Sequence, residues 1–149
     1  VLGGHGDTMV PMPNQTLIDG KSLTDLISEK KINHVKLNAI VERTRKGGAE
    51  IVKLLEKGSA YYAPAASGVE MAESYLKNQK KQLPCAAHLN GEYGVKNLYA
   101  GVPVIIGSKG VEKIIELELS EQEKKGFKQS IDAVEDLFNA AKKIDPGLN

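Results

Sequence analysis

A histidine placed among glycines is the first feature of the sequence that suggests chemistry. His5 lies between Gly4 and Gly6, with Gly3 one position earlier and Asp7 two positions later. Glycine has no Cβ atom, so these neighbours can adopt strained dihedrals and let a ligand approach the backbone closely. Histidine in general has a pKa of about 6.5, which suits proton transfer near neutral pH. The pattern favours a proton-transferring group, and the alternative is a turn histidine bonded to backbone.

The segment 1–11 resembles the catalytic-histidine segment of the NAD-dependent lactate and malate dehydrogenases, whose pattern is Gly-x-His-Gly-Asp-[Ser/Thr]. Thr8 completes that pattern here. Residues 60–76 are similar to the family's helix beside the nicotinamide and the substrate. Residues 91–112 are similar to its closing β-hairpins. The likeness covers the whole chain in family order and corresponds to roughly the carboxyl-terminal half of such an enzyme.

The resemblance implies a role for four residues. It makes His5 the proton donor and acceptor, places Gly4 and Ala60 beside the substrate, and places Pro64 beside the nicotinamide ring. The alternative for Ala60 and Pro64 is loop packing alone. Many lactate-type relatives carry threonine and isoleucine at the positions of Ala60 and Pro64. The sequence is therefore closer to the lactate-dehydrogenase-like malate dehydrogenases and their apicomplexan lactate relatives.

The expected activity is an NAD-dependent interconversion of malate and oxaloacetate, and the alternative is that of an L-lactate dehydrogenase. The residue that selects the substrate should lie upstream of Val1. So should the aspartate that orients His5, the substrate-binding arginines and the acidic residue that distinguishes NAD from NADP. A third possibility is that residues 1–149 alone form an inactive oligomerisation and substrate half-site.

Composition limits the other classes of function. The 149 residues are 41% hydrophobic and 26% charged, which is enough for one soluble domain. A formal net charge of +1 provides no broad field to attract nucleic acid or an anionic membrane. Cys85 is the single cysteine, so no intrachain disulfide can form, and no apolar run of about 20 residues is present. We expect a cytoplasmic protein.

Metal binding is a rival chemistry that the sequence does not support. Its potential ligands are His5, Asp7, His34, Cys85 and His88. None of them is spaced as in His-x-x-x-His or Cys-x-x-Cys, so we predict no metal site. A surface or capping position is the simpler interpretation of His34, and a small buried apolar role that of Cys85.

The predicted fold class is α+β, with antiparallel hairpins or a meander packed against long helices and no Rossmann domain. The chain opens on Val1 with a strand-like start, and it contains no Gly-x-Gly-x-x-Gly fingerprint. We expect residues 1–149 to form a single carboxyl-terminal substrate-binding and catalytic domain, a piece of a longer enzyme whose upstream part binds most of the NAD.

Sequence periodicity and turn residues position the elements. Asp19-Gly20 predicts a hairpin, and Thr24 is expected to cap a short helix through Ile27. Strands are expected over 83–89, 99–107 and 111–119, in an antiparallel meander. The predicted longer helices are 32–57, 64–80 and one that begins with a Ser120–Glu123 capping box and ends at Asp145-Pro146-Gly147.

Small residues on two of these helices predict close contacts. Gly47-Gly48 in the middle of a helix costs stability, so another backbone should approach that face. The family resemblance places a subunit contact nearby, which implies a homodimer or homotetramer. In the second helix the predicted buried stripe consists of Ala65, Val69, Ala72 and Leu76.

Overall fold

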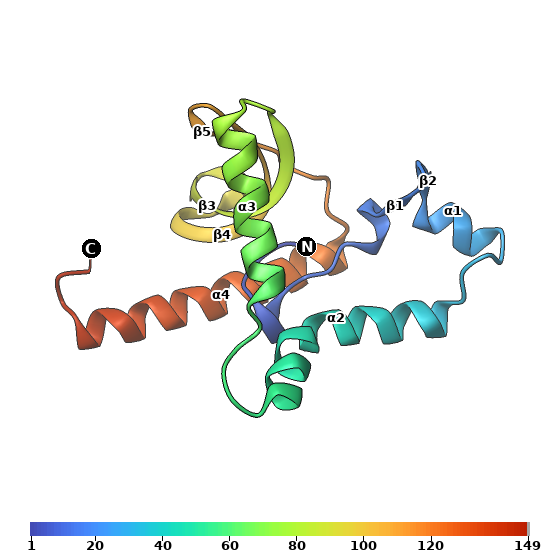
Figure 1. Ribbon diagram of the computed structural model, residues 1–149, viewed down its shortest axis with the longest axis horizontal. Coiled ribbons are helices and arrows are strands. Elements are labelled where there is room, and N and C mark those ends of the chain that lie inside the picture. The colour runs from blue at the N-terminus through green and yellow to red at the C-terminus, as the bar shows by residue number, and fades with distance from the viewer. Residues whose placement is uncertain (149) are drawn as a thin grey trace.

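The computed structural model describes residues 1–148 and shows a small sheet bordered by long helices (Figure 1). The helices are α1 (Leu23–Ser28), α2 (His34–Leu55), α3 (Tyr62–Leu76) and α4 (Glu121–Ile144). The strands are β1 (Leu17–Ile18), β2 (Lys21–Ser22), β3 (Lys81–Asn90), β4 (Lys96–Gly107) and β5 (Gly110–Ile114). Every strand pair among the described residues is antiparallel, which confirms the predicted α+β class without a Rossmann sheet.

The main sheet has the order β3-β4-β5, so β4 is central, as predicted. Val102 and Val104 on β4 are fully buried, and Ile106 is 7% exposed. These side chains lie on one face because successive strand residues point to opposite sides. Pro84 has no amide hydrogen to donate, and it lies in β3 at the edge of this sheet.

The third strand is shorter than predicted, because β5 ends at Ile114 instead of continuing to Leu119. Tyr93 provides the reason. Its hydroxyl donates to the carbonyl of Ile115 at 2.7 Å and accepts from the Leu117 amide at 3.0 Å. Burial raises the pKa of Tyr93, which keeps the hydroxyl protonated as a donor. A side chain thus satisfies backbone groups that a longer strand would have paired.

Helix α4 begins and ends where the sequence predicts. Ser120 and Glu123 form the capping box, and the helix ends at Ile144. Phe127 and Ile131 on its apolar face join the core of the sheet. The carboxyl-terminal part of α4 extends beyond the sheet in Figure 1, and Ile144 is 87% exposed.

Helix α2 contacts the rest of the chain only lightly. None of its residues is buried, although it matches the predicted long helix. An ideal Cβ at Gly47 or Gly48 would meet nothing within 4 Å in the described chain. The backbone approach predicted for this glycine pair is therefore not made by residues 1–148.

The predicted buried stripe on α3 is wrong. Ala65 and Ala72 are exposed, and Val69 and Leu76 are 63% and 78% exposed. The only buried α3 residue is Ser74. Its hydroxyl donates to the Ile106 carbonyl at 2.6 Å and accepts from the Lys81 amide at 3.2 Å. The helix meets the sheet through its polar face at Ser74, so the alanine stripe points elsewhere.

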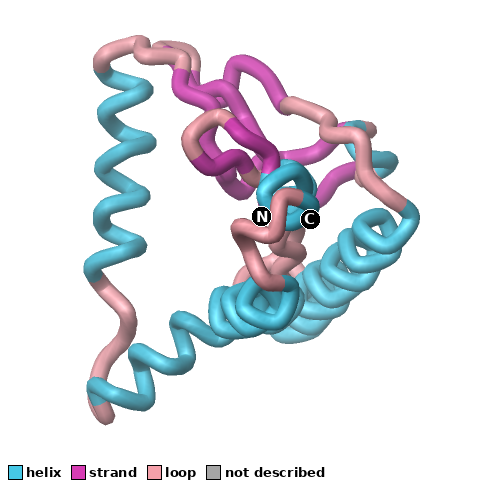
Figure 2. The backbone as a smooth tube through the Cα atoms, turned by 90° about the vertical axis from the view of Figure 1, so that its right-hand side faces the viewer, coloured by secondary structure: helices cyan, strands magenta, loops and turns pink. Residues whose placement is uncertain are grey.

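The amino-terminal region contains the predicted Asp19-Gly20 hairpin, with β1 paired to β2. The cap of α1 differs from the prediction, because Ser22 and not Thr24 accepts the Asp25 amide, at 3.0 Å. The helix starts immediately after β2, which leaves Thr24 inside its first turn. Figure 2 shows the main sheet above the long helices α2 and α4, with α3 upright along one side. No helix among the described residues is long and apolar enough to cross a membrane.

Candidate active-site loop

The segment around His5 is a loop closed at its base by two hydrogen bonds. Leu2 and Val10 exchange amide–carbonyl bonds of 2.9 Å in both directions, and both side chains are buried. A short 3-10 helix, η1 (Gly6–Thr8), forms the far side of the loop. The Met9 amide closes this turn by donating to the Gly6 carbonyl at 3.0 Å. The loop is therefore an ordered structure built on a buried base.

Gly3 and Gly101 bring the loop against the central strand. Each amide donates to the carbonyl of the other residue at 2.8 Å. An ideal Cβ on Gly101 would lie 2.6 Å from the Gly3 carbonyl oxygen, which is too close for a real side chain. Gly3 has φ +84°, and a Cβ there would lie 2.2 Å from Ser130 Oγ. Both positions require glycine because two backbones and a helix meet there.

Gly4 is held by α4. Its amide donates to Ser130 Oγ at 2.7 Å, and Ser130 is only 1% exposed. A Cβ at Gly4 would lie 2.9 Å from Thr8 Oγ1 and 3.3 Å from a methyl carbon of Val134. The residue before the histidine is therefore fixed by a hydrogen bond and confined on two sides.

The His5 side chain itself is exposed. Among residues 1–148 its imidazole forms no hydrogen bond and no ion pair. At Gly6, the residue after His5, an ideal Cβ would meet nothing within 4 Å. An exposed imidazole on an anchored loop can exchange a proton with a bound molecule, since nothing in the described chain competes for its nitrogens.

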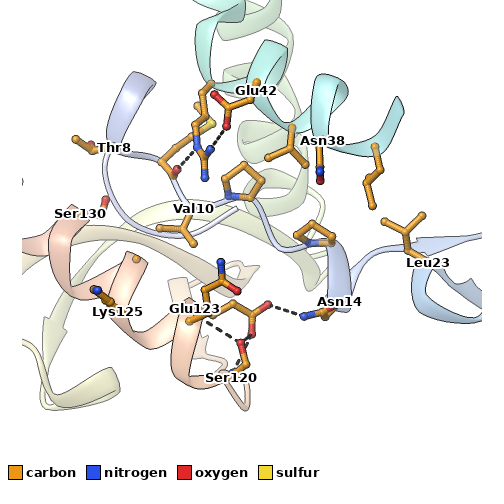
Figure 3. Close-up of a pocket in the computed structure, with 18 of the residues that line it drawn as sticks. Thr8, Val10, Asn14, Leu23, Asn38, Glu42, Ser120, Glu123, Lys125 and Ser130 are labelled. Atoms are coloured by element: carbon orange, nitrogen blue, oxygen red, sulfur yellow. Dashed lines mark hydrogen bonds and ion pairs between the residues drawn. The ribbon is translucent and has the colours of Figure 1, made fainter. Parts of the chain in front are cut away.

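A groove of about 1140 Å³ opens beside the loop, between α1, α2 and the start of α4 (Figure 3). Asp7 and Thr8 of η1 line it, and His5 does not. Arg45 of α2 crosses to the loop, where its Nε donates to the Met9 carbonyl at 3.2 Å while Nη1 pairs with Glu42. This arginine ties α2 to the histidine loop.

The other two residues predicted from the resemblance lie on a different segment. Ala60 is half-buried in the connection between α2 and α3, and Pro64 is exposed in the first turn of α3. No hydrogen bond within residues 1–148 joins either one to the His5 loop.

The remaining candidate ligands do not come together. Within residues 1–148 no three His, Cys, Asp or Glu side chains are grouped to hold a metal ion. His34 is the exposed first residue of α2, and Asn33 caps that helix. Cys85 is half-buried with its sulfur 3.3 Å from that of Met71, and burial raises the pKa of its thiol. The raised pKa makes this thiol a poor nucleophile.

Sequence reasoning missed Ser130 and Gly101, which anchor the loop. Gly101 lies inside a strand, where glycine indicates close approach of another backbone. Ser130 lies three residues after Phe127 and four before Val134, on the apolar face of α4. A polar residue on a buried helix face needs a partner, and that signal was available.

Residues 1–144 match the model of the lactate/malate dehydrogenase family, alpha/beta C-terminal domain. The chain belongs to this family. A malate dehydrogenase of Pelagibacter ubique (strain HTCC1062) is 67% identical over 149 residues, which are 100% of this chain and 47% of that protein. The family resemblance inferred from the histidine loop is thus confirmed.

Solved structures of the same family have this fold. The malate dehydrogenase of Cryptosporidium parvum aligns with a TM-score of 0.93 and 45% identity, over 95% of this chain and 45% of that one. The lactate dehydrogenase of Eimeria maxima, solved with NADH and oxamate, aligns with a TM-score of 0.93 and 45% identity. That alignment covers 98% of this chain and 46% of the other. The chain spans about half the length of these relatives.

Proposed function

We propose that this chain provides the proton-transferring residue, His5, of an NAD-dependent malate dehydrogenase. The observation that carries the proposal is an exposed imidazole on a loop anchored to both β4 and α4. The 67% identity to a malate dehydrogenase favours malate as the substrate. Since the relatives are about twice as long, the working enzyme includes a further part that binds most of the NAD.

The chemistry requires a base and an acid at the same position. When malate is oxidised, the imidazole of His5 accepts the proton of the C2 hydroxyl. NAD supplies the hydride acceptor for the hydrogen on the same carbon. When oxaloacetate is reduced, the His5 imidazolium returns its proton to the carbonyl oxygen. In this proposal Gly4 and Ala60 lie beside the substrate, and Pro64 lies beside the nicotinamide ring.

Replacing His5 with asparagine in the full-length enzyme tests the proposed role. General acid–base catalysis contributes about 10²- to 10⁴-fold, so we expect kcat with oxaloacetate to fall by that factor. NADH absorbance measures the rate. His88→Asn, which alters another exposed histidine, is the matched control and should keep normal activity. Full activity in His5→Asn would contradict the mechanism.

A second assay uses residues 1–149 alone. We propose that this isolated chain is an inactive half-site. The described residues lack a dinucleotide-binding sheet, so we expect no NADH oxidation from this chain by itself. Turnover by residues 1–149 would overturn the half-site proposal. The His5→Asn assay tests the proton-transfer role independently of this result.

Lactate dehydrogenase is the second candidate, favoured by the likeness to the Eimeria maxima enzyme. The two activities differ in whether the substrate carries a second carboxylate or a methyl group. We expect the full-length enzyme to have a higher kcat/KM for oxaloacetate than for pyruvate. Steady-state assays with both keto acids decide this, and a preference for pyruvate would make lactate the substrate.

We also propose that the working enzyme is a homodimer or homotetramer. Large apolar side chains on α2 and α3 are exposed, among them Leu54 and Tyr62 at 77% and 91%. The open face at Gly47-Gly48 allows close approach of another backbone. Sedimentation velocity of the full-length enzyme should show a dimer or a tetramer. A stable monomer at assay concentration would contradict the proposal.

A further inference from the structure

We propose that Ser130 of α4 is a positioning residue for His5, and this inference rests on the proposed function. The Ser130 hydroxyl accepts the amide hydrogen of Gly4, the residue immediately before the histidine, at 2.7 Å. The two residues are 126 positions apart in the sequence. Ser130 therefore connects the last helix of the chain to the loop that presents the imidazole.

The hydrogen bond completes the anchoring of one peptide group. The peptide between Gly3 and Gly4 contributes one carbonyl and one amide. Its carbonyl accepts from the Gly101 amide on β4 at 2.8 Å, and its amide donates to Ser130 on α4. With both polar ends held by different elements, the peptide plane cannot rotate without breaking a hydrogen bond. This fixes the direction in which the chain enters His5.

The anchored peptide matters because, within residues 1–148, no side chain forms a hydrogen bond or an ion pair with the His5 imidazole. Among residues 1–148 nothing hydrogen-bonds to the His5 ring, and an ideal Cβ on the next residue, Gly6, would meet nothing within 4 Å. Catalytic groups have to be held within about 0.5 Å of their productive position. Within this chain, that precision depends on the backbone before His5.

The environment of Ser130 explains why a small hydroxyl residue stands there. Its Cβ would lie 2.7 Å from an ideal Cβ on Gly3, so a larger side chain would displace the loop. Alanine would fit but would leave the Gly4 amide without its acceptor. A partly buried amide that loses its partner is costly, so the loop is expected to shift to find another acceptor.

Ser74 provides a matched control. It is the other buried serine among the described residues, with 0% exposure against 1% for Ser130. Its hydroxyl makes two hydrogen bonds to backbone, with Ile106 and Lys81, and neither partner belongs to the histidine loop. Ser74→Ala therefore removes buried hydrogen bonding of a similar kind without touching the proposed positioning contact.

The test compares Ser130→Ala and Ser74→Ala in the full-length enzyme, with rates expressed per folded active site. Small misplacement of a catalytic group costs up to about 10²-fold, so we expect kcat of Ser130→Ala to fall at least about tenfold with KM for oxaloacetate little changed. The solvent deuterium isotope effect on kcat should rise, because proton transfer becomes slower. Ser74→Ala should keep the kcat, the KM and the isotope effect of the unaltered enzyme.

Ser130→Cys is a second variant that keeps the test possible if Ser130→Ala does not fold. Cysteine adds no atom to the side chain, although its sulfur is slightly larger than the serine oxygen. Sulfur is a weak acceptor, so kcat should again fall and the isotope effect again rise. Unchanged kcat and isotope effect in a folded Ser130 variant would overturn the inference. Equal changes in Ser74→Ala would also overturn it, by showing a general stability effect. An active His5→Asn enzyme would instead overturn the proposed function.

Discussion

The close approach of the Gly3-Gly4 backbone to Gly101 of β4 and to Ser130 of α4 is the constraint on which the histidine loop depends. Two reciprocal hydrogen bonds join Gly3 to Gly101, and a third joins Gly4 to Ser130. These contacts need positions without side chains, because a Cβ at Gly3 or Gly101 would overlap the neighbouring element. Glycine therefore has a packing role here as well as the conformational one that φ +84° requires at Gly3.

The rest of the described chain can be understood as support for this junction. The core residues of β4 hold the strand that carries Gly101, and Phe127 and Ile131 hold the helix that carries Ser130. Tyr93 fixes the connection between β5 and α4 by bonding to Ile115 and Leu117. A rigid sheet and a capped helix thus position the loop, while α2 and α3 leave apolar surface exposed, as is typical of faces that pack against another polypeptide.

The sequence predicted the elements whose signals are local. The Asp19-Gly20 turn and the Ser120–Glu123 capping box depend on residues within a few positions of each other, and the structure confirms both. Long-range contacts caused two of the errors. Tyr93 ends β5 early from 22 positions away, and Ser74 turns α3 so that its alanine stripe is exposed. Sequence periodicity indicates that one face of a helix or strand is apolar, but it does not indicate which neighbouring element covers that face.

The candidate site was predictable in part for the same reason. The glycine–histidine pattern indicated the loop, whereas the partners that hold it come from β4 and α4, about 100 and 126 positions away. No local pattern relates such distant residues. A glycine within a strand and a serine on an apolar helix face were nevertheless visible as departures from their surroundings, and such departures indicate contacts with other backbone.

Amide hydrogen exchange of the full-length enzyme, resolved at single residues, tests the central claim most directly. The Gly4 and Gly101 amides donate to Ser130 Oγ and to the Gly3 carbonyl, so the account predicts slow exchange at both. The His5 amide has no acceptor within residues 1–148 and should exchange faster. Exchange of the Gly4 amide as fast as that of His5 would contradict an anchored histidine loop.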